Sequence, residues 1–184
     1  MSTIRFILIL FLSGCSIIQD NSNKTKNIQS IYGGEIKINQ FEVETLGETS
    51  ELWKNGQDIL LVVNFGKVEK TSGLKNNVDY INLSSINYEL LLKNKTYKTS
   101  AQIKFSNPRT NYLNIKLEYK LLSESKKFFK NCNSDCFVVE ETFNAPLIRW
   151  SGENYYLFNN NELVESIQTV TPFSKKIRIF HAKK

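Results

Sequence analysis

The residues of this 184-residue chain best suited to redox, metal or nucleophilic chemistry are three cysteines and a single histidine. Cys132 and Cys136 are separated by only three residues. Thiol exchange typically uses two intervening residues at a helix N-terminus, so the longer spacing in a turn favours a structural disulfide. Closing so short a loop contributes about 2 kcal/mol. We predict that the bridge pins a loop tip, and free thiols in protein isolated from an oxidising compartment would refute it.

The remaining chemistry-bearing residues do not predict a catalytic site. A general base near neutral pH is most often a histidine, and a structural zinc ion takes four N, S or O ligands. The one histidine, His181, lies in a strand pattern close to the C-terminus. Glu140 and Glu141 are adjacent, so in a strand they point to opposite faces and cannot act as a carboxylate pair. We therefore expect no enzyme activity, no metal and no cofactor.

The N-terminal segment has the order of an export signal: a positive charge at Arg5, an apolar run over residues 6–12, and then small residues. The apolar run is shorter than the roughly 20 residues needed to span a bilayer. The segment Leu12-Ser13-Gly14-Cys15 resembles the lipobox of bacterial lipoproteins. The resemblance implies that Cys15 becomes the lipidated N-terminus of the mature chain and anchors it to a membrane.

These observations divide the chain into three parts. Residues 1–14 are predicted to be a signal peptide, residues 15–33 a lipidated cysteine with a flexible polar tether, and residues 34–184 a single β domain. Ser16 stands where an Asp commonly retains Gram-negative lipoproteins at the inner membrane, so the resemblance implies the outer membrane, with the domain facing the periplasm. An oxidising compartment also permits the bridge between Cys132 and Cys136.

The charge balance does not indicate a nucleic-acid partner. The chain carries 24 Lys and Arg against 18 Asp and Glu, a net charge of +6, but 20 of the 24 are lysine. The sequence also contains 21 Asn and 18 Ile, and this joint excess is typical of a nucleotide-composition bias. The basic stretches near residues 93–98, 126–130 and 175–178 are interpreted as solvated loop and edge lysines.

The apolar pattern of the body predicts β-strands. Residues 111–122 alternate strictly, and the continuous run 59–65 predicts a central strand covered on both faces. Helical signals are poor and are confined to one turn near residues 49–54 and another at residues 162–167. Further strands are expected at residues 36–43, 86–92, 97–105, 137–143, 146–151, 155–158, 163–170 and 176–181. Short strands with frequent turns favour an antiparallel β-sandwich, immunoglobulin-like or transthyretin-like, with a closed β-barrel as the alternative.

The sequence leaves several functions open. The first is a lipid-anchored, non-enzymatic module of the cell envelope that binds a protein partner, either as an accessory of a secretion system or as a periplasmic immunity protein. The alternative is a lipocalin-like barrel that carries a hydrophobic small molecule, and the third is a cell-wall hydrolase or its inhibitor. Arg149-Trp150 and Tyr155-Tyr156 could form an aromatic platform, although packing within the sheet is the favoured interpretation. The binding residues stay unassigned.

Overall fold

A computed structural model of the chain describes residues 24–32, 35–46, 50–56, 58–83, 88–107, 109–122, 129, 136–172 and 174–181. The elements in this part of the chain are β1 (Lys24–Tyr32), β2 (Glu35–Thr45), β3 (Ser50–Lys54), β4 (Leu60–Asn64), β5 (Lys67–Ser72), β6 (Asn77–Ile81), α1 (Tyr88–Asn94), β7 (Thr96–Asn107), β8 (Arg109–Leu122), β9 (Cys136–Ala145), the 3₁₀ turn Pro146–Ile148, β10 (Trp150–Asn159), β11 (Glu162–Gln168) and β12 (Ile177–Phe180). The all-β prediction is confirmed.

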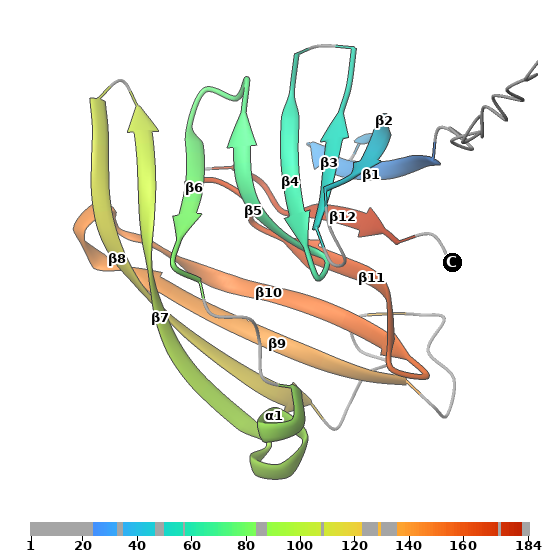
Figure 1. Cartoon of the computed structure of the whole chain (residues 1–184), viewed down its shortest axis with the longest axis vertical. Helices are drawn as coiled ribbons and strands as arrows, with labels where there is room; N and C mark the ends of the chain where they lie inside the picture. Colours follow the sequence, from blue (N-terminus) through green and yellow to red (C-terminus); the bar gives the residue numbers. More distant parts are fainter. Residues whose placement is uncertain are drawn as a thin grey trace, which may run out of the picture.

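The strands form one continuous antiparallel sheet that curls around the interior (Figure 1). Each strand pairs with its neighbours in sequence, and β1 pairs with both β2 and β12, so that Ile28 lies opposite Ile179. The strand order therefore closes on itself, as in the barrel alternative. The immunoglobulin-like or transthyretin-like sandwich needs two separate stacked sheets, so that prediction is corrected. Alternating hydrophobicity identifies the buried face of a strand but not its partners.

The weakest junction of the closed sheet lies between β5 and β6. These two strands share one pair of opposed residues, Lys70 and Asp79, whereas β7 and β8 pair over twelve positions from Thr96 to Asn107. Beyond this pair, a side-chain hydrogen bond joins the two strands in place of the backbone ladder. The hydroxyl of Thr71 accepts a hydrogen bond from the backbone N–H of Val78 at 3.0 Å. The sheet consequently opens at its outer surface here.

The long strands β7 to β10 supply most of the core. On β8 the inward residues Leu113, Ile115, Leu117 and Tyr119 are buried, as the alternation predicts. A second cluster around Trp53 packs under β2 to β5 and β12. A third cluster lies where Phe129, Val138, Tyr155 and Leu157 pack together.

Several local predictions are corrected by the structure. The apolar run at residues 86–92, predicted as a strand, contributes instead to helix α1, because a short apolar run fits either element. The two predicted helical turns are β3 and part of β11. On β4, Leu61 and Val63 are buried but Leu60 is 37% exposed, so the strand is not covered on both faces.

The boundaries of strands β1 and β10 also differ from the expectation. Strand β1 lies inside the segment predicted as a tether, so the sheet begins earlier than the predicted boundary at residue 34. Strand β10 runs without interruption from Trp150 to Asn159, where two separate strands were expected at residues 146–151 and 155–158. The sequence of β1 is rich in polar residues, and its strand conformation depends on pairing with β2 and β12 rather than on its own hydrophobic pattern.

Candidate functional site

The residues singled out from the sequence occupy different places in the fold. Cys15 and Cys132 lie outside the described residues, and Cys136 opens β9 in a half-buried position, so lipidation and the disulfide remain predictions. His181 follows β12, and its Nε2 lies 3.2 Å from the hydroxyl of Ser166. Trp150 is buried against Phe143. The packing interpretation of this aromatic segment is confirmed, and it offers no exposed platform there.

The most polar part of the interior is built around Glu141. This residue points inward from the middle of β9 and is fully buried, whereas its neighbour Glu140 lies on the other face of the strand, opposite Tyr155. The carboxylate of Glu141 pairs with the ammonium group of Lys67, which is 3% exposed. Asn154 donates a second hydrogen bond to the same carboxylate at 2.7 Å. The buried charge is therefore both paired and hydrogen-bonded, as burial requires.

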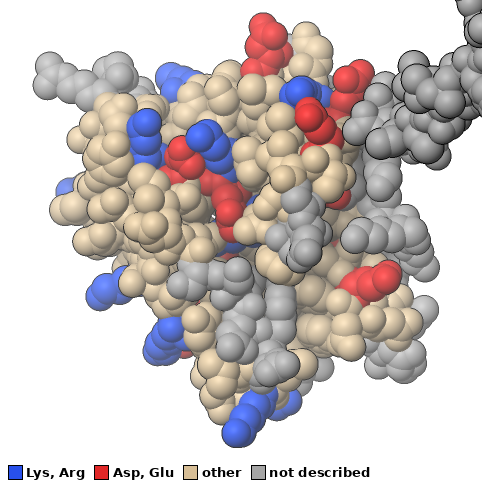
Figure 2. Space-filling view, in the orientation of Figure 1, with Lys and Arg blue, Asp and Glu red and all other residues tan. Residues whose placement is uncertain are grey.

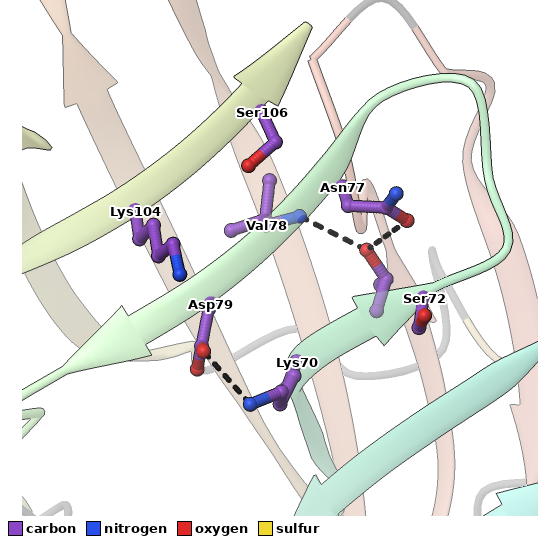
Figure 3. A pocket seen from close by; sticks show the side chains of 8 residues that line it. Lys70, Ser72, Asn77, Val78, Asp79, Lys104 and Ser106 are labelled. Carbon is purple, nitrogen blue, oxygen red and sulfur yellow. Dashed lines mark hydrogen bonds and ion pairs between the residues drawn. The ribbon is translucent and has the colours of Figure 1, made fainter. Parts of the chain in front are cut away.

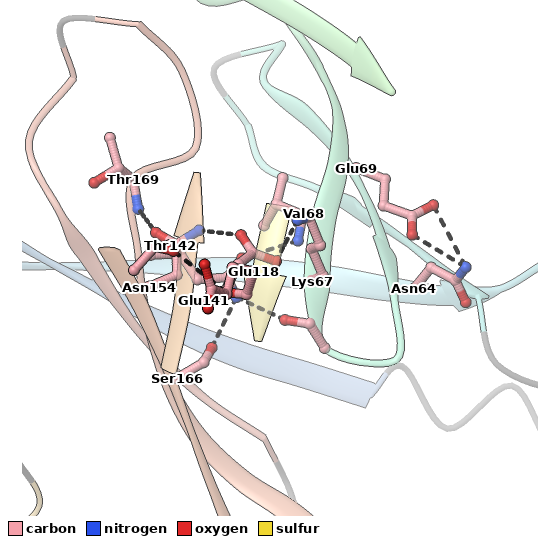
Figure 4. A network of polar contacts seen from close by, with 12 residues as sticks. Asn64, Lys67, Val68, Glu69, Glu118, Glu141, Thr142, Asn154, Ser166 and Thr169 are labelled. Atoms are coloured by element: carbon pink, nitrogen blue, oxygen red, sulfur yellow. Dashed lines mark hydrogen bonds and ion pairs between the residues drawn. The ribbon is translucent and has the colours of Figure 1, made fainter. Parts of the chain in front are cut away.

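This network links strands that are far apart in the sequence (Figure 4). The side chain of Gln168 on β11 donates to the backbone oxygen of Gly66 at 2.6 Å and accepts from the backbone N–H of Val68 at 3.0 Å. Gln168 also donates to the hydroxyl of Ser166 at 2.9 Å. Together with the pair between Lys67 and Glu141, these bonds fasten the β4–β5 hairpin to β9, β10 and β11.

The hairpin can approach β11 so closely because its turn contains a glycine. Gly66 has a φ of +80°, and a Cβ atom at this position would lie 1.8 Å from Cδ2 of Leu163. Both the left-handed backbone and the lack of space exclude a larger residue without rearrangement. The sequence signal for the network is a glutamate at an inward position of the largely apolar strand β9, and it became interpretable only with the strand pairing.

The buried network also raises the pKa of two tyrosines. Burial, and then the negative charge of Glu141, hold the pKa of Tyr80 and of Tyr119 well above 10. The ammonium nitrogen of Lys67 lies 4.7 Å from the ring centroid of Tyr80, a cation–π arrangement that adds to its stabilisation. Both phenols therefore remain protonated at physiological pH, and the interior holds a fixed polar arrangement rather than an exposed acid and base.

Glu69 gives the network a measurable pH dependence. Burial raises the pKa of Glu69 above 4.5, although hydrogen bonds from Asn64 and the charge of Lys67 oppose the shift. A raised pKa in the folded state gives a stabilising contribution below about 4.5 that is lost as the pH rises through the folded-state pKa. We expect Glu69→Gln to be more stable than the parent protein at pH 7, and this advantage to shrink at pH 4.

Urea unfolding at the two pH values measures this difference. The control is Glu162→Gln, which removes an exposed carboxylate at the start of β11. The interpretation would be contradicted if Glu69→Gln were less stable than the parent protein at pH 7, or if its advantage were larger at pH 4 than at pH 7.

A hollow of about 180 Å³ lies at the weak junction between β5 and β6 (Figure 3). Figure 2 shows basic and acidic side chains side by side near the middle of one face, where the surface is hollowed. The hollow is lined by residues from three neighbouring strands: Lys70, Thr71 and Ser72 on β5, Asn77, Val78 and Asp79 on β6, and Lys104 and Ser106 on β7. Sequence reasoning missed this site because β5 and β6 are short, polar strands.

The charges of the hollow are unequal. The ammonium group of Lys70 lies 2.9 Å from the carboxylate of Asp79, and both side chains are partly exposed. Among the described residues, Lys104 forms no ion pair. The site therefore combines one neutralised pair with one additional positive charge, which suits a ligand that carries hydroxyl groups and a single negative charge.

Within the described part of the chain, no three His, Cys, Asp or Glu side chains gather as a metal would require. The described helices are all too short or too polar to cross a membrane.

Comparison with known proteins shows the class and the family to which the chain belongs. The class is that of bacterial envelope lipoproteins, in agreement with the lipobox. Residues 39–180 match the sequence model of the family described as Group 4 capsule polysaccharide lipoprotein gfcB, YjbF, and the chain belongs to this family. The crystal structure of the hypothetical lipoprotein YmcC from Escherichia coli K12 has a similar fold, with a TM-score of 0.62 at 13% identity, covering 84% of this chain and 85% of that one. No curated protein matches the sequence significantly.

Proposed function

We propose that this chain is a lipid-anchored protein of the outer membrane that serves capsule polysaccharide assembly as a non-enzymatic binding module. The observation that carries the proposal is the family match, which extends from β2 to the end of β12. The lipobox at residues 12–15 supplies the anchor, and one acyl chain alone binds a membrane only marginally, so the multiple chains of a lipoprotein are needed for stable attachment.

The arrangement of polar groups supports binding rather than catalysis. A catalytic acid or base must reach its substrate. Lys67 and Glu141 are buried and engaged with each other, so they hold the β4–β5 hairpin instead. A group of accessible polar side chains lines the hollow on the outer face of β5 to β7, on paired strands of the closed sheet.

Among the functions that the sequence left open, the family favours an accessory of polysaccharide secretion over a periplasmic immunity protein. The closed strand order meets one requirement of a lipocalin-like carrier. A hydrophobic cargo, however, also needs an apolar lumen, and this interior contains a buried ion pair and hydrogen-bonded Asn154 and Gln168. We therefore do not assign a hydrophobic cargo.

The anchor is tested by Cys15→Ser. We expect the variant to remain an unlipidated, full-length precursor, because the thioether and the cleavage both depend on this cysteine. Palmitate labelling followed by electrophoresis measures both properties, and labelling of the variant at the parent level would refute the anchor. Density-gradient fractionation of the parent protein with inner-membrane markers would contradict the outer-membrane assignment.

The role in capsule assembly is tested in the source bacterium. We expect deletion of the gene to reduce surface polysaccharide, and the parent gene to restore it. Complementation with Cys15→Ser is expected to fail, because the unanchored chain is not held at the membrane. Co-purification from detergent-solubilised envelopes then identifies the protein partner. Unchanged surface polysaccharide after deletion would contradict the proposed function.

A further inference from the structure

We infer that the outer face of β5 to β8 binds an acidic sugar unit, a pyranose that carries one carboxylate. The inference deepens the proposed function and rests on it for the source of the ligand, because a capsule polysaccharide would present such units as a repeating chain.

Strand register places six polar residues in a regular array on this face. Asp79 lies opposite Lys70 on one side and Lys104 on the other, so the three charged side chains form one row across β5, β6 and β7. Asn77 lies opposite Ser106, two residues along, and Ser72 lies two residues beyond Lys70 on β5. Residues two apart share a face. Donors and acceptors therefore repeat across the surface, as recognition of ring hydroxyls requires.

The space for a ligand comes from the weak junction between the strands. Beyond the pair of Lys70 and Asp79, β5 and β6 are joined through the Thr71 hydroxyl, which also donates to Oδ1 of Asn77 at 3.5 Å (Figure 3). The backbone N–H of Leu74 donates to the same oxygen at 3.1 Å. These bonds orient the Asn77 amide and leave its NH₂ group to donate. We assign the pyranose ring to the resulting hollow of about 180 Å³.

The charges of the row select an acidic sugar. Lys104 supplies the positive charge that is not neutralised by an ion pair in the described structure, and a carboxylate accepts its charge-assisted hydrogen bond. Asp79, already paired with Lys70, presents its carboxylate to ligand hydroxyl groups. A dianionic phosphate offers fewer hydroxyl groups to Ser72 and Ser106 than a sugar ring does, and its second negative charge would be repelled by Asp79.

An exposed aromatic ring completes the array. Tyr112 on β8 lies directly opposite Lys104, and it is 59% exposed. At the next outward-facing pair of β7 and β8, the hydroxyls of Ser106 and Thr110 lie 3.3 Å apart. A tyrosine held at the surface of a rigid sheet offers an apolar face to the C–H groups of a sugar ring while its hydroxyl remains in water. The row thus combines a cation, hydroxyl partners and a stacking surface.

Calorimetric titration of the full chain in detergent with tetragalacturonate tests the inference. We expect Lys104→Gln to weaken binding about tenfold, which corresponds to the loss of one hydrogen bond to a charged group. We expect Tyr112→Ala to weaken it about fivefold and Tyr112→Phe to leave it nearly unchanged, because the ring is retained. The matched control is Lys116→Gln, which removes an exposed lysine from the outer face of β8, away from the hollow.

The outcomes separate this inference from its alternatives. Equal losses in Lys104→Gln and Lys116→Gln would indicate general electrostatic attraction and overturn the assigned site. Equally tight binding of neutral maltotetraose, or displacement by an equal concentration of inorganic phosphate, would overturn the acidic sugar. Failure to bind tetragalacturonate would overturn the inference, while the capsule phenotype of the gene deletion would still decide the proposed function separately.

Discussion

Replacement of Lys67 by Met is expected to lower the free energy of unfolding by about 3–5 kcal/mol, because it leaves a buried carboxylate without its counter-charge. Glu141 is fully buried, and the hydrogen bond that Asn154 donates to its carboxylate carries no full positive charge. The variant also removes the cation that lies over the Tyr80 ring. Chemical denaturation at pH 7 measures the loss.

A second substitution distinguishes lost charge compensation from a simple packing defect. The double variant Lys67→Met/Glu141→Gln is expected to recover much of the stability, because a neutral amide oxygen still accepts from Asn154 and needs no counter-charge. The matched control is Lys54→Met, which breaks the exposed pair with Glu44 and should cost less than about 1 kcal/mol. A loss in Lys67→Met as small as in Lys54→Met would show that the buried pair does not fasten the hairpin.

Replacement of Gly73 by Ala is expected to destabilise the fold by about 3 kcal/mol. Gly73 has a φ of +78°, which costs an L-residue roughly 1–2 kcal/mol. A Cβ atom would also lie 2.3 Å from the backbone oxygen of Asp58, so backbone rather than a flexible side chain must move. Such overpacking adds about 1–3 kcal/mol.

The control for this prediction is Gly56→Ala, since a Cβ atom at Gly56 meets nothing within 4 Å. Thermal unfolding of the two variants beside the parent protein measures the contrast. Similar melting temperatures for Gly73→Ala and Gly56→Ala would contradict the close approach of the β5–β6 loop to Asp58.

The sequence predicts the fold best where one face of a strand is uniformly apolar. Strand β8 is such a case, since its inward residues from Leu113 to Tyr119 were identified by alternation alone. The helix α1 was not predicted, because the apolar run at residues 86–92 carries no cap or periodicity long enough to separate helix from strand. Strand β1 was missed because its sequence is polar and its conformation depends on pairing with β2 and β12.

The candidate site was beyond prediction for a related reason. The row formed by Lys70, Asp79 and Lys104 is created by the register between three strands, and register does not follow from any one segment. The charge of Glu141 was noticed only as one of two adjacent carboxylates. Its partner, Lys67, is 74 residues away in the sequence, and only the strand topology brings the two side chains together.

The pairing of β1 with β12 has a consequence for the order of folding. Ile28 can lie opposite Ile179 only after nearly the whole polypeptide is available, so the ring cannot close before the last strand is present. Contacts between such distant segments form slowly. Until then the outer edges of β1 and β11 remain unpaired and offer a template to other chains. The last strand to arrive therefore ends the period in which this protein is most prone to aggregate.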